Sequence, residues 1–137
     1  MQEKTRYRLT KQMILRGRTN FQRLFDEGHG FRSRNLVLRY RVADANAPSK
    51  AIVAFLVPKK HGRAVDRNRV RRLMREAWRL EYPNIAARLP DKGLLHIGMI
   101  WSGKPENIET PALQEVQSDL HNGIDRLLSR ASSSEPD

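Results

Sequence analysis

The sequence of 137 residues contains no cysteine, so it has no disulfide framework, no thiolate nucleophile and no thiolate metal ligand. Aromatic residues make up only 7% of the chain, and its longest apolar run is Ala51–Val57. A membrane-spanning helix needs about 20 apolar residues, and a secretory signal needs an apolar stretch that the basic N-terminal segment does not supply. The length fits a single domain. We therefore expect one cytoplasmic domain without a membrane partner.

What the chain has in excess is positive charge. Lysine and arginine number 26 against 15 aspartates and glutamates, which gives a net charge of +11. Residues 1–79 hold 21 basic and 6 acidic side chains, whereas residues 80–137 hold 5 and 9. Such an uneven distribution indicates a polyanionic partner. Composition alone leaves nucleic acid, an anionic membrane surface and acidic proteins open, and it favours nucleic acid.

The hydrophobic periodicity predicts helix, strands, helix, strand and helix in that order, which is typical of an α+β fold. We expect a single-domain, two-layer sandwich in which helices pack on a small mixed sheet. The expected elements are a helix capped by Thr19 and ending at Gly28, strands over 36–42, 51–57 and 94–101, a helix over 66–82, and a last helix that opens at Thr110.

The connecting segments follow from turn residues and prolines. Residues 28–30 are expected to form a turn and residues 43–49 a loop, while Pro83 is expected to end or break the second long helix. Asp66 is expected to be the N-cap of that helix. The domain is predicted to span residues 1–130, with an irregular basic arm over residues 1–18 and a disordered tail over residues 131–137.

One segment, Lys59–Arg79, holds nine of the 26 basic residues. On a helix its arginines recur every four residues from Arg67 to Arg79, and like charges at this spacing destabilise a helix by a few tenths of a kcal/mol per pair. A polyanion would relieve this repulsion, and guanidinium groups bind phosphate in a bidentate manner. The candidate nucleic-acid-binding residues are Lys59, Lys60, Arg63, Arg67, Asn68, Arg69, Arg71, Arg72 and Arg75.

Two other interpretations of the basic segment are weaker. A face that only keeps the protein soluble usually mixes both signs of charge. A helix that lies on a membrane surface needs free apolar residues. Here the apolar residues recur at helical spacing and are needed for the core: Val70, Leu73, Met74, Ala77 and Trp78. The four histidines lack metal-ligand spacing, and the acidic residues of the basic half are scattered. We therefore predict no catalytic residue and no metal site in the protein itself.

The residues of the basic segment resemble a known family, the protein subunit of bacterial ribonuclease P. The resemblance rests on Lys59-Lys60, Gly62 and Ala64-Val65, and above all on the run from Arg67 to Ala77. Residues 21–25 followed by Gly28 are similar to the family's first helix, and residues 34–38 and 93–100 are similar to two of its strands. The resemblance covers roughly residues 8–128.

The resemblance implies a small α/β protein with a left-handed strand–helix–strand crossover, an exception to the usual hand. It implies a monomeric protein bound to one catalytic RNA, which with Mg²⁺ removes the 5′ leader of precursor transfer RNA. The endoribonuclease chemistry would belong to the RNA, and the protein would hold no cofactor of its own. The sheet and first helix would form a leader-binding cleft, to which we assign Phe21, Phe25, Arg39 and Tyr40.

The sequence alone leaves the role of the aromatic rings and the class of function open. Phe21 and Phe25 lie at helical spacing beside Leu24, so core packing competes with base stacking for both rings; the resemblance favours stacking for Phe21. A structural RNA-binding protein of the ribosomal type, without a role in cleavage, is the alternative function. A free-standing metal nuclease is a third possibility, which cleavage by RNA-free protein would reveal.

Overall fold

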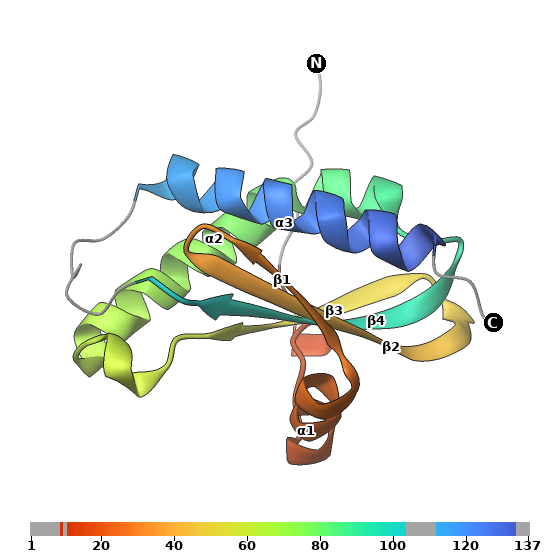
Figure 1. Ribbon diagram of the computed structural model, residues 1–137, viewed down its shortest axis with the longest axis horizontal. Coiled ribbons are helices and arrows are strands. Elements are labelled where there is room, and N and C mark those ends of the chain that lie inside the picture. The colour runs from red at the N-terminus through yellow and green to blue at the C-terminus, as the bar shows by residue number, and fades with distance from the viewer. Residues whose placement is uncertain (1–8, 10, 104–111, 134–137) are drawn as a thin grey trace.

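The computed structural model describes residues 9, 11–103 and 112–133. Three parts of the prediction lie outside these residues: residues 1–8 and 10 of the expected arm, the opening of the last helix at Thr110, and residues 134–137 of the expected tail. The elements in chain order are η1 (Lys11–Met13), α1 (Arg18–Glu27), β1 (His29–Ser33), β2 (Leu36–Pro48), β3 (Lys50–Leu56), η2 (Lys59–His61), α2 (Ala64–Arg88), β4 (Lys92–Trp101) and α3 (Leu113–Ser133) (Figure 1).

The four strands form one mixed sheet in the order β1-β2-β4-β3. β2 pairs with β1 and β4 in antiparallel fashion, whereas β3 and β4 are parallel and α2 connects them. The predicted α+β fold with a small mixed sheet is thus confirmed. The β3–α2–β4 unit is the strand–helix–strand crossover that the resemblance implies, and its hand stays a prediction.

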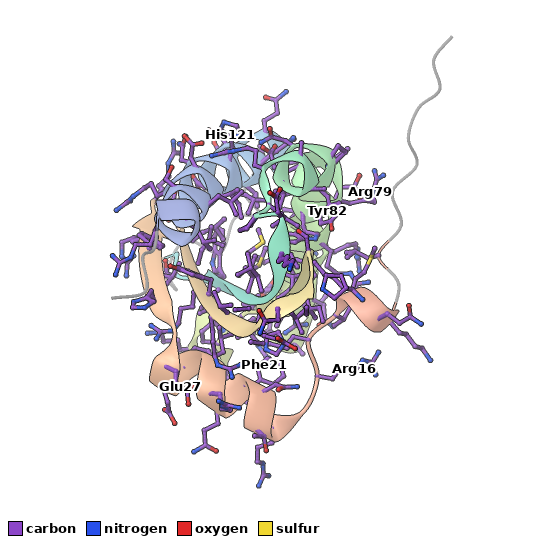
Figure 2. All side chains as sticks on the ribbon, turned by 90° about the vertical axis from the view of Figure 1, so that its right-hand side faces the viewer. Arg16, Phe21, Glu27, Arg79, Tyr82 and His121 are labelled. Carbon is purple, nitrogen blue, oxygen red and sulfur yellow. The ribbon has the colours of Figure 1, made fainter. Side chains whose placement is uncertain are left out.

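Alternation along the strands divides the sheet into two unlike faces. On one face, α2 and α3 cover a core built from aliphatic and aromatic side chains (Figure 1). On the other face lies α1, whose Leu24 is fully buried in a smaller cluster with Leu15 and Ala54. Helices therefore cover both faces of the sheet, whereas the sequence suggested two layers (Figure 2).

Helix α2 runs without interruption for 25 residues and passes through Pro83. Proline in a helix interior costs about 3 kcal/mol, and the prediction of a break at Pro83 was wrong because the following turn is anchored in the core. Pro83 itself is exposed, while Trp78 and Ile85 on either side of it are almost completely buried.

A polar network joins α2 to α3 on the side of the molecule away from α1. Glu81 is only 7% exposed, and its carboxylate accepts hydrogen bonds from the side-chain amides of Asn84, at 3.0 Å, and Gln117, at 3.3 Å. His121 Nδ1 lies 2.6 Å from Glu81 Oε2. Two of these partners belong to α3, so a buried carboxylate of α2 is satisfied mainly by the neighbouring helix.

Element boundaries differ from the prediction at several places. The residues expected as a turn begin strand β1, and β2 continues to Pro48 through what was expected to be a loop. Gly17 is the N-cap of α1 and Thr19 lies inside that helix. Ile14 forms a bridge to Val53, so the expected irregular arm adds to the β3 edge, and α3 extends to Ser133, into the expected tail.

Candidate nucleic-acid interface

The basic segment begins in the turn between β3 and α2. Lys59 and Lys60 are exposed in η2, and Gly62 has a φ of 109°, a backbone conformation that side chains other than glycine rarely adopt. The Asp66 carboxylate accepts the backbone N–H of Arg63 at 3.3 Å. Asp66 therefore lies at the third position of α2, and its predicted role as the N-cap was wrong: Arg63 is the N-cap residue.

Several arginines of α2 contact neutral groups. Arg67 Nε donates to the carbonyl of Gly62 at 3.2 Å, and Arg71 Nη1 donates to Asn68 Oδ1 at 2.7 Å. These contacts hold the guanidinium groups in place without cancelling their charge, so the charge stays available to an anion.

Two further arginines show how position on the helix changes the use of the charge. The Arg75 guanidinium lies 5.9 Å from the centre of the Phe55 ring, a cation–π contact. Arg79, which the four-residue spacing placed with the others, forms two hydrogen bonds to Glu76. These bonds hold the pKa of Glu76 below its usual range. Arg79 is therefore charge-paired, whereas Arg67 and Arg71 contact neutral groups.

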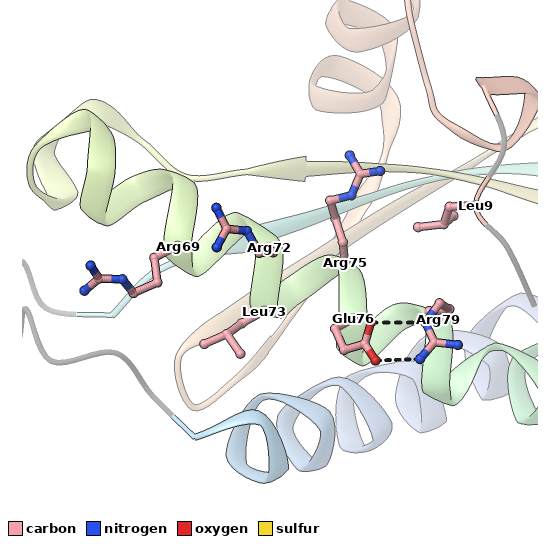
Figure 3. Close-up of a pocket in the computed structure, with 7 residues that line it drawn as sticks. All are labelled: Leu9, Arg69, Arg72, Leu73, Arg75, Glu76 and Arg79. Carbon is pink, nitrogen blue, oxygen red and sulfur yellow. Dashed lines mark hydrogen bonds and ion pairs between the residues drawn. The ribbon is translucent and has the colours of Figure 1, made fainter.

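A groove of about 630 Å³ runs along α2 (Figure 3). Arg69 and Arg72, both exposed, line it toward the start of the helix, and the Glu76–Arg79 pair lines it further along (Figure 3). Leu73 and Leu9 supply apolar lining. Cations above an apolar surface suit a polyanion that also carries flat, apolar bases.

The second candidate surface is the sheet face that carries α1. Alternate residues of the strands point to this face, and the register places Val37 beside Ile100 and Ile100 beside Leu56. All three are partly exposed, and we call them the aliphatic strip. They form an apolar floor that the helices of the opposite face do not cover.

The two aromatic residues of α1 border this strip. Leu24 points down onto the sheet, where its Cδ2 would lie 3.0 Å from a Cβ placed on Gly98. Glu27 lies on one flank of α1 because it pairs with Arg41, and the helical spacing puts Phe21 and Phe25 on the opposite flank. Phe25 is 44% exposed, whereas Phe21 packs partly into the Leu24 cluster.

Arg39 is on the α1 side of the sheet, as predicted, and it contacts the end of α1. Its Nη2 donates to the carbonyls of Phe25, at 2.9 Å, and Gly28, at 2.8 Å, and its Nε lies 3.4 Å from the carbonyl of Leu24. The same guanidinium lies 5.7 Å from the centre of the Phe25 ring. Arg39 therefore caps the helix and supports the exposed ring.

The assignment of Tyr40 to the leader-binding cleft was wrong. Tyr40 is 4% exposed in the core beneath α3, and its ring stacks with Phe31 at a centroid distance of 6.2 Å. Successive residues of a strand point to opposite faces, so Arg39 and Tyr40 cannot both face α1. Burial raises the pKa of the Tyr40 hydroxyl.

The sequence reasoning missed the polar residues on the other flank of α1. Arg41 is 8% exposed, and its Nε lies 2.9 Å from Glu27 Oε1. The hydrogen bonds from Arg41 and from Arg23 lower the pKa of Glu27. His96, the strand partner of Arg41, is 5% exposed, and its Nδ1 has no hydrogen-bond partner among the described residues. The alternation of Val37, Arg39 and Arg41 was the signal that could have identified this flank.

No helix in the described ranges is long and apolar enough to cross a membrane. Within the same ranges, no three histidine, aspartate or glutamate side chains gather into a group that could hold a metal ion.

Comparison with known proteins gives a consistent result. The family model described as Ribonuclease P matches residues 9–128. The ribonuclease P protein component of Chlorobaculum tepidum is 34% identical, over 94% of this chain and 88% of the relative. That of Coprothermobacter proteolyticus is 32% identical, over 73% of this chain and 84% of the relative. Both relatives are thus matched over most of their own length.

Solved structures agree with the sequence comparison. The RNase P protein from Thermotoga maritima superposes with a TM-score of 0.67 at 28% identity, over 82% of this chain and 96% of that one. The RNase P protein of Staphylococcus aureus, at 20% identity and a TM-score of 0.63, shares the fold over 84% of this chain and 94% of that one. With its arginine-rich α2, its mixed sheet and these matches, the chain belongs to the ribonuclease P protein family.

Proposed function

We propose that the basic segment of α2 binds the catalytic RNA of ribonuclease P. The observation that carries this proposal is the arrangement of six arginines between Arg67 and Arg79 around a single acid, Glu76. Glu76 is paired with Arg79, while Arg67 and Arg71 donate to neutral groups and keep their charge for an external anion. The groove beside Arg69 and Arg72 adds apolar surface for a base.

The α1 side of the sheet would bind the 5′ leader of precursor transfer RNA. The aliphatic strip and the exposed Phe25 ring supply surface on which the bases of a single strand stack, a contact worth about 1–3 kcal/mol per base. Since Phe25 is more exposed than Phe21, the structure favours Phe25 as the stacking ring, while Phe21 contributes to the packing of α1 as well.

The cleavage chemistry is assigned to the RNA subunit with Mg²⁺. Phosphodiester hydrolysis by a protein requires grouped carboxylates for metal ions or a positioned base. Carboxylates near the two surfaces are instead used in ion pairs, as Asp66 is with Arg63 and Glu27 is with Arg41. The protein would act as a monomer in the complex, and its function would place it in the bacterial cytoplasm.

Reconstitution tests this proposal. We expect the protein alone to leave precursor transfer RNA intact, and the catalytic RNA with the protein to cleave it at a lower Mg²⁺ concentration than the RNA alone, since protein charges replace part of the counterions. Cleavage by RNA-free protein that an Asp→Asn change abolishes would contradict it. Failure of the protein to change cleavage at any Mg²⁺ concentration would favour the alternative of a structural RNA-binding protein.

The leader contact requires its own comparison. Phe25→Ala should weaken the binding of precursor more than that of mature transfer RNA, because only the precursor carries a 5′ single strand. Phe21→Ala should also lower the melting temperature, since that ring is partly buried. Equal losses for precursor and mature substrates in both variants would show that neither ring contacts the leader.

A further inference from the structure

The aliphatic strip continues to the outer edge of the sheet. Arg32 of β1 is the strand partner of Val37, and Val37, Ile100 and Leu56 follow as neighbours across β2, β4 and β3. Directly paired residues share a face, so Arg32 lies on the α1 side. With about 4.8 Å between strands, the row spans roughly 14 Å, and α2 with its basic segment follows the β3 end of it.

The Arg32 side chain reaches back over the end of the strip. Its Nη1 donates to the hydroxyl of Ser102 at 3.2 Å, and Ser102 lies two residues beyond Ile100, on the same face by alternation. The carbonyl of Arg32 accepts a hydrogen bond from Arg126 Nη1 at 2.9 Å. α3 therefore holds the backbone from one face while Ser102 orients the guanidinium on the other.

The charge of Arg32 has no acidic counterpart in the described part of the chain. Two other arginines of the sheet region differ in this respect, since Arg34 lies 3.4 Å from Asp119 and Arg41 lies 2.9 Å from Glu27. Arg32 is exposed, and its one side-chain partner among the described residues is a neutral hydroxyl. A guanidinium that is oriented by a neutral hydroxyl, and that lies at the end of the aliphatic strip, is suited to bind a phosphate.

We propose that Arg32, oriented by Ser102, binds a backbone phosphate of the leader at the β1 edge of the sheet. This inference rests on the proposed function. Under the proposed function the catalytic RNA holds the active site, and the basic segment binds that RNA at the other end of the strip. The leader therefore enters beside α2 and leaves over β1. Arg32 then contacts nucleotides farther from the cleavage site than Phe25 does, and distal leader nucleotides add to affinity.

The test uses the protein assembled with its catalytic RNA and non-cleavable precursors whose leader is shortened one nucleotide at a time. Arg32→Ala should weaken binding of long-leader precursor roughly fivefold to tenfold. It should also reduce the log–log salt slope by about 0.7, the value for one phosphate contact of a single strand. Both effects should vanish at a leader length at which Phe25→Ala still weakens binding.

Two variants serve as controls. Arg88→Ala also removes one positive charge, but from an arginine that pairs with Asp125 of α3. It should leave the dependence of precursor binding on leader length unchanged. Arg32→Lys keeps the charge and should keep the salt slope of binding. The melting temperature of each variant is measured to show that it is folded. If Arg32→Ala behaves like Arg88→Ala while Phe25→Ala remains leader-dependent, the phosphate site is refuted. If Phe25→Ala shows no leader dependence either, the proposed leader surface itself fails.

Discussion

Replacing Arg39 by methionine should loosen α1 from the sheet. The guanidinium of Arg39 links β2 to the last turn of α1, where it donates to the carbonyls of Phe25 and Gly28. Methionine keeps much of the aliphatic stem but removes every donor. The last carbonyls of a helix have no partner within the helix, so the variant leaves them to water.

The size of the effect follows from the contacts. The two short hydrogen bonds join a charged donor to partly exposed carbonyls, and after competition from water each contributes about 1 kcal/mol. A cation at a helix C-terminus adds about 0.3–1 kcal/mol, while the 3.4 Å contact to Leu24 adds little. The loss is therefore about 2–3 kcal/mol, equivalent to roughly 6–12 °C in melting temperature for a chain of this size.

Urea unfolding and amide hydrogen exchange in α1 measure this loss. The matched control is Arg23→Met, which removes an exposed arginine paired with Glu27 on the same helix and should cost less than about 0.5 kcal/mol. Arg39→Lys should not rescue the variant, because one ammonium group cannot reproduce the geometry of the guanidinium. The account of Arg39 is refuted if Arg39→Met and Arg23→Met are equally stable.

Three further outcomes are expected. Arg72→Ala should reduce the salt slope of binding to the catalytic RNA by about 0.7–0.9, and Arg79→Ala, whose charge is already paired, should change it less; equal slopes would contradict the assignment. Burial lowers the pKa of His96 below its ordinary 6.5, so the folded protein favours the neutral imidazole. The free energy of unfolding should therefore be unaffected by this group above pH 6.5 and should fall as the pH drops below 6.5. Urea unfolding of His96→Leu should show a weaker dependence on pH in that range. Gly98→Val should cost about 1–3 kcal/mol in urea unfolding because its side chain would displace Leu24; an unchanged midpoint would show that α1 does not pack as described.

The basic segment and the hydrophobic stripe of α2 could be predicted from the sequence because they are local patterns. Met74, Ala77 and Trp78 are buried, as the helical spacing predicts. Whether α2 continues through Pro83 could not be predicted from a local pattern. Whether a proline ends a helix depends on how firmly the next turn is held, and here Ile85 and the Glu81 network hold it against the body of the protein.

The sheet shows where local patterns become ambiguous. The alternation from Leu36 onward correctly divided β2 into two faces, and it already implied that Arg39 and Tyr40 point in opposite directions. Assigning both to one surface ignored that rule. Strand β1 was missed because Gly28 and Gly30 indicate a turn, whereas its pairing with β2 comes from the hairpin as a whole.

The Glu81 network has a consequence for the alignment of the helices. If α3 slid along α2 by one turn, about 5.4 Å, the partners of Glu81 on α3 would move out of reach. The buried carboxylate would then lose these contacts, which would greatly reduce the stability of the fold. One register between the two helices is therefore strongly preferred. That register also sets where Arg126 meets the carbonyl of Arg32. A polar contact on the side away from α1 thus fixes the position of an arginine at the opposite face of the sheet.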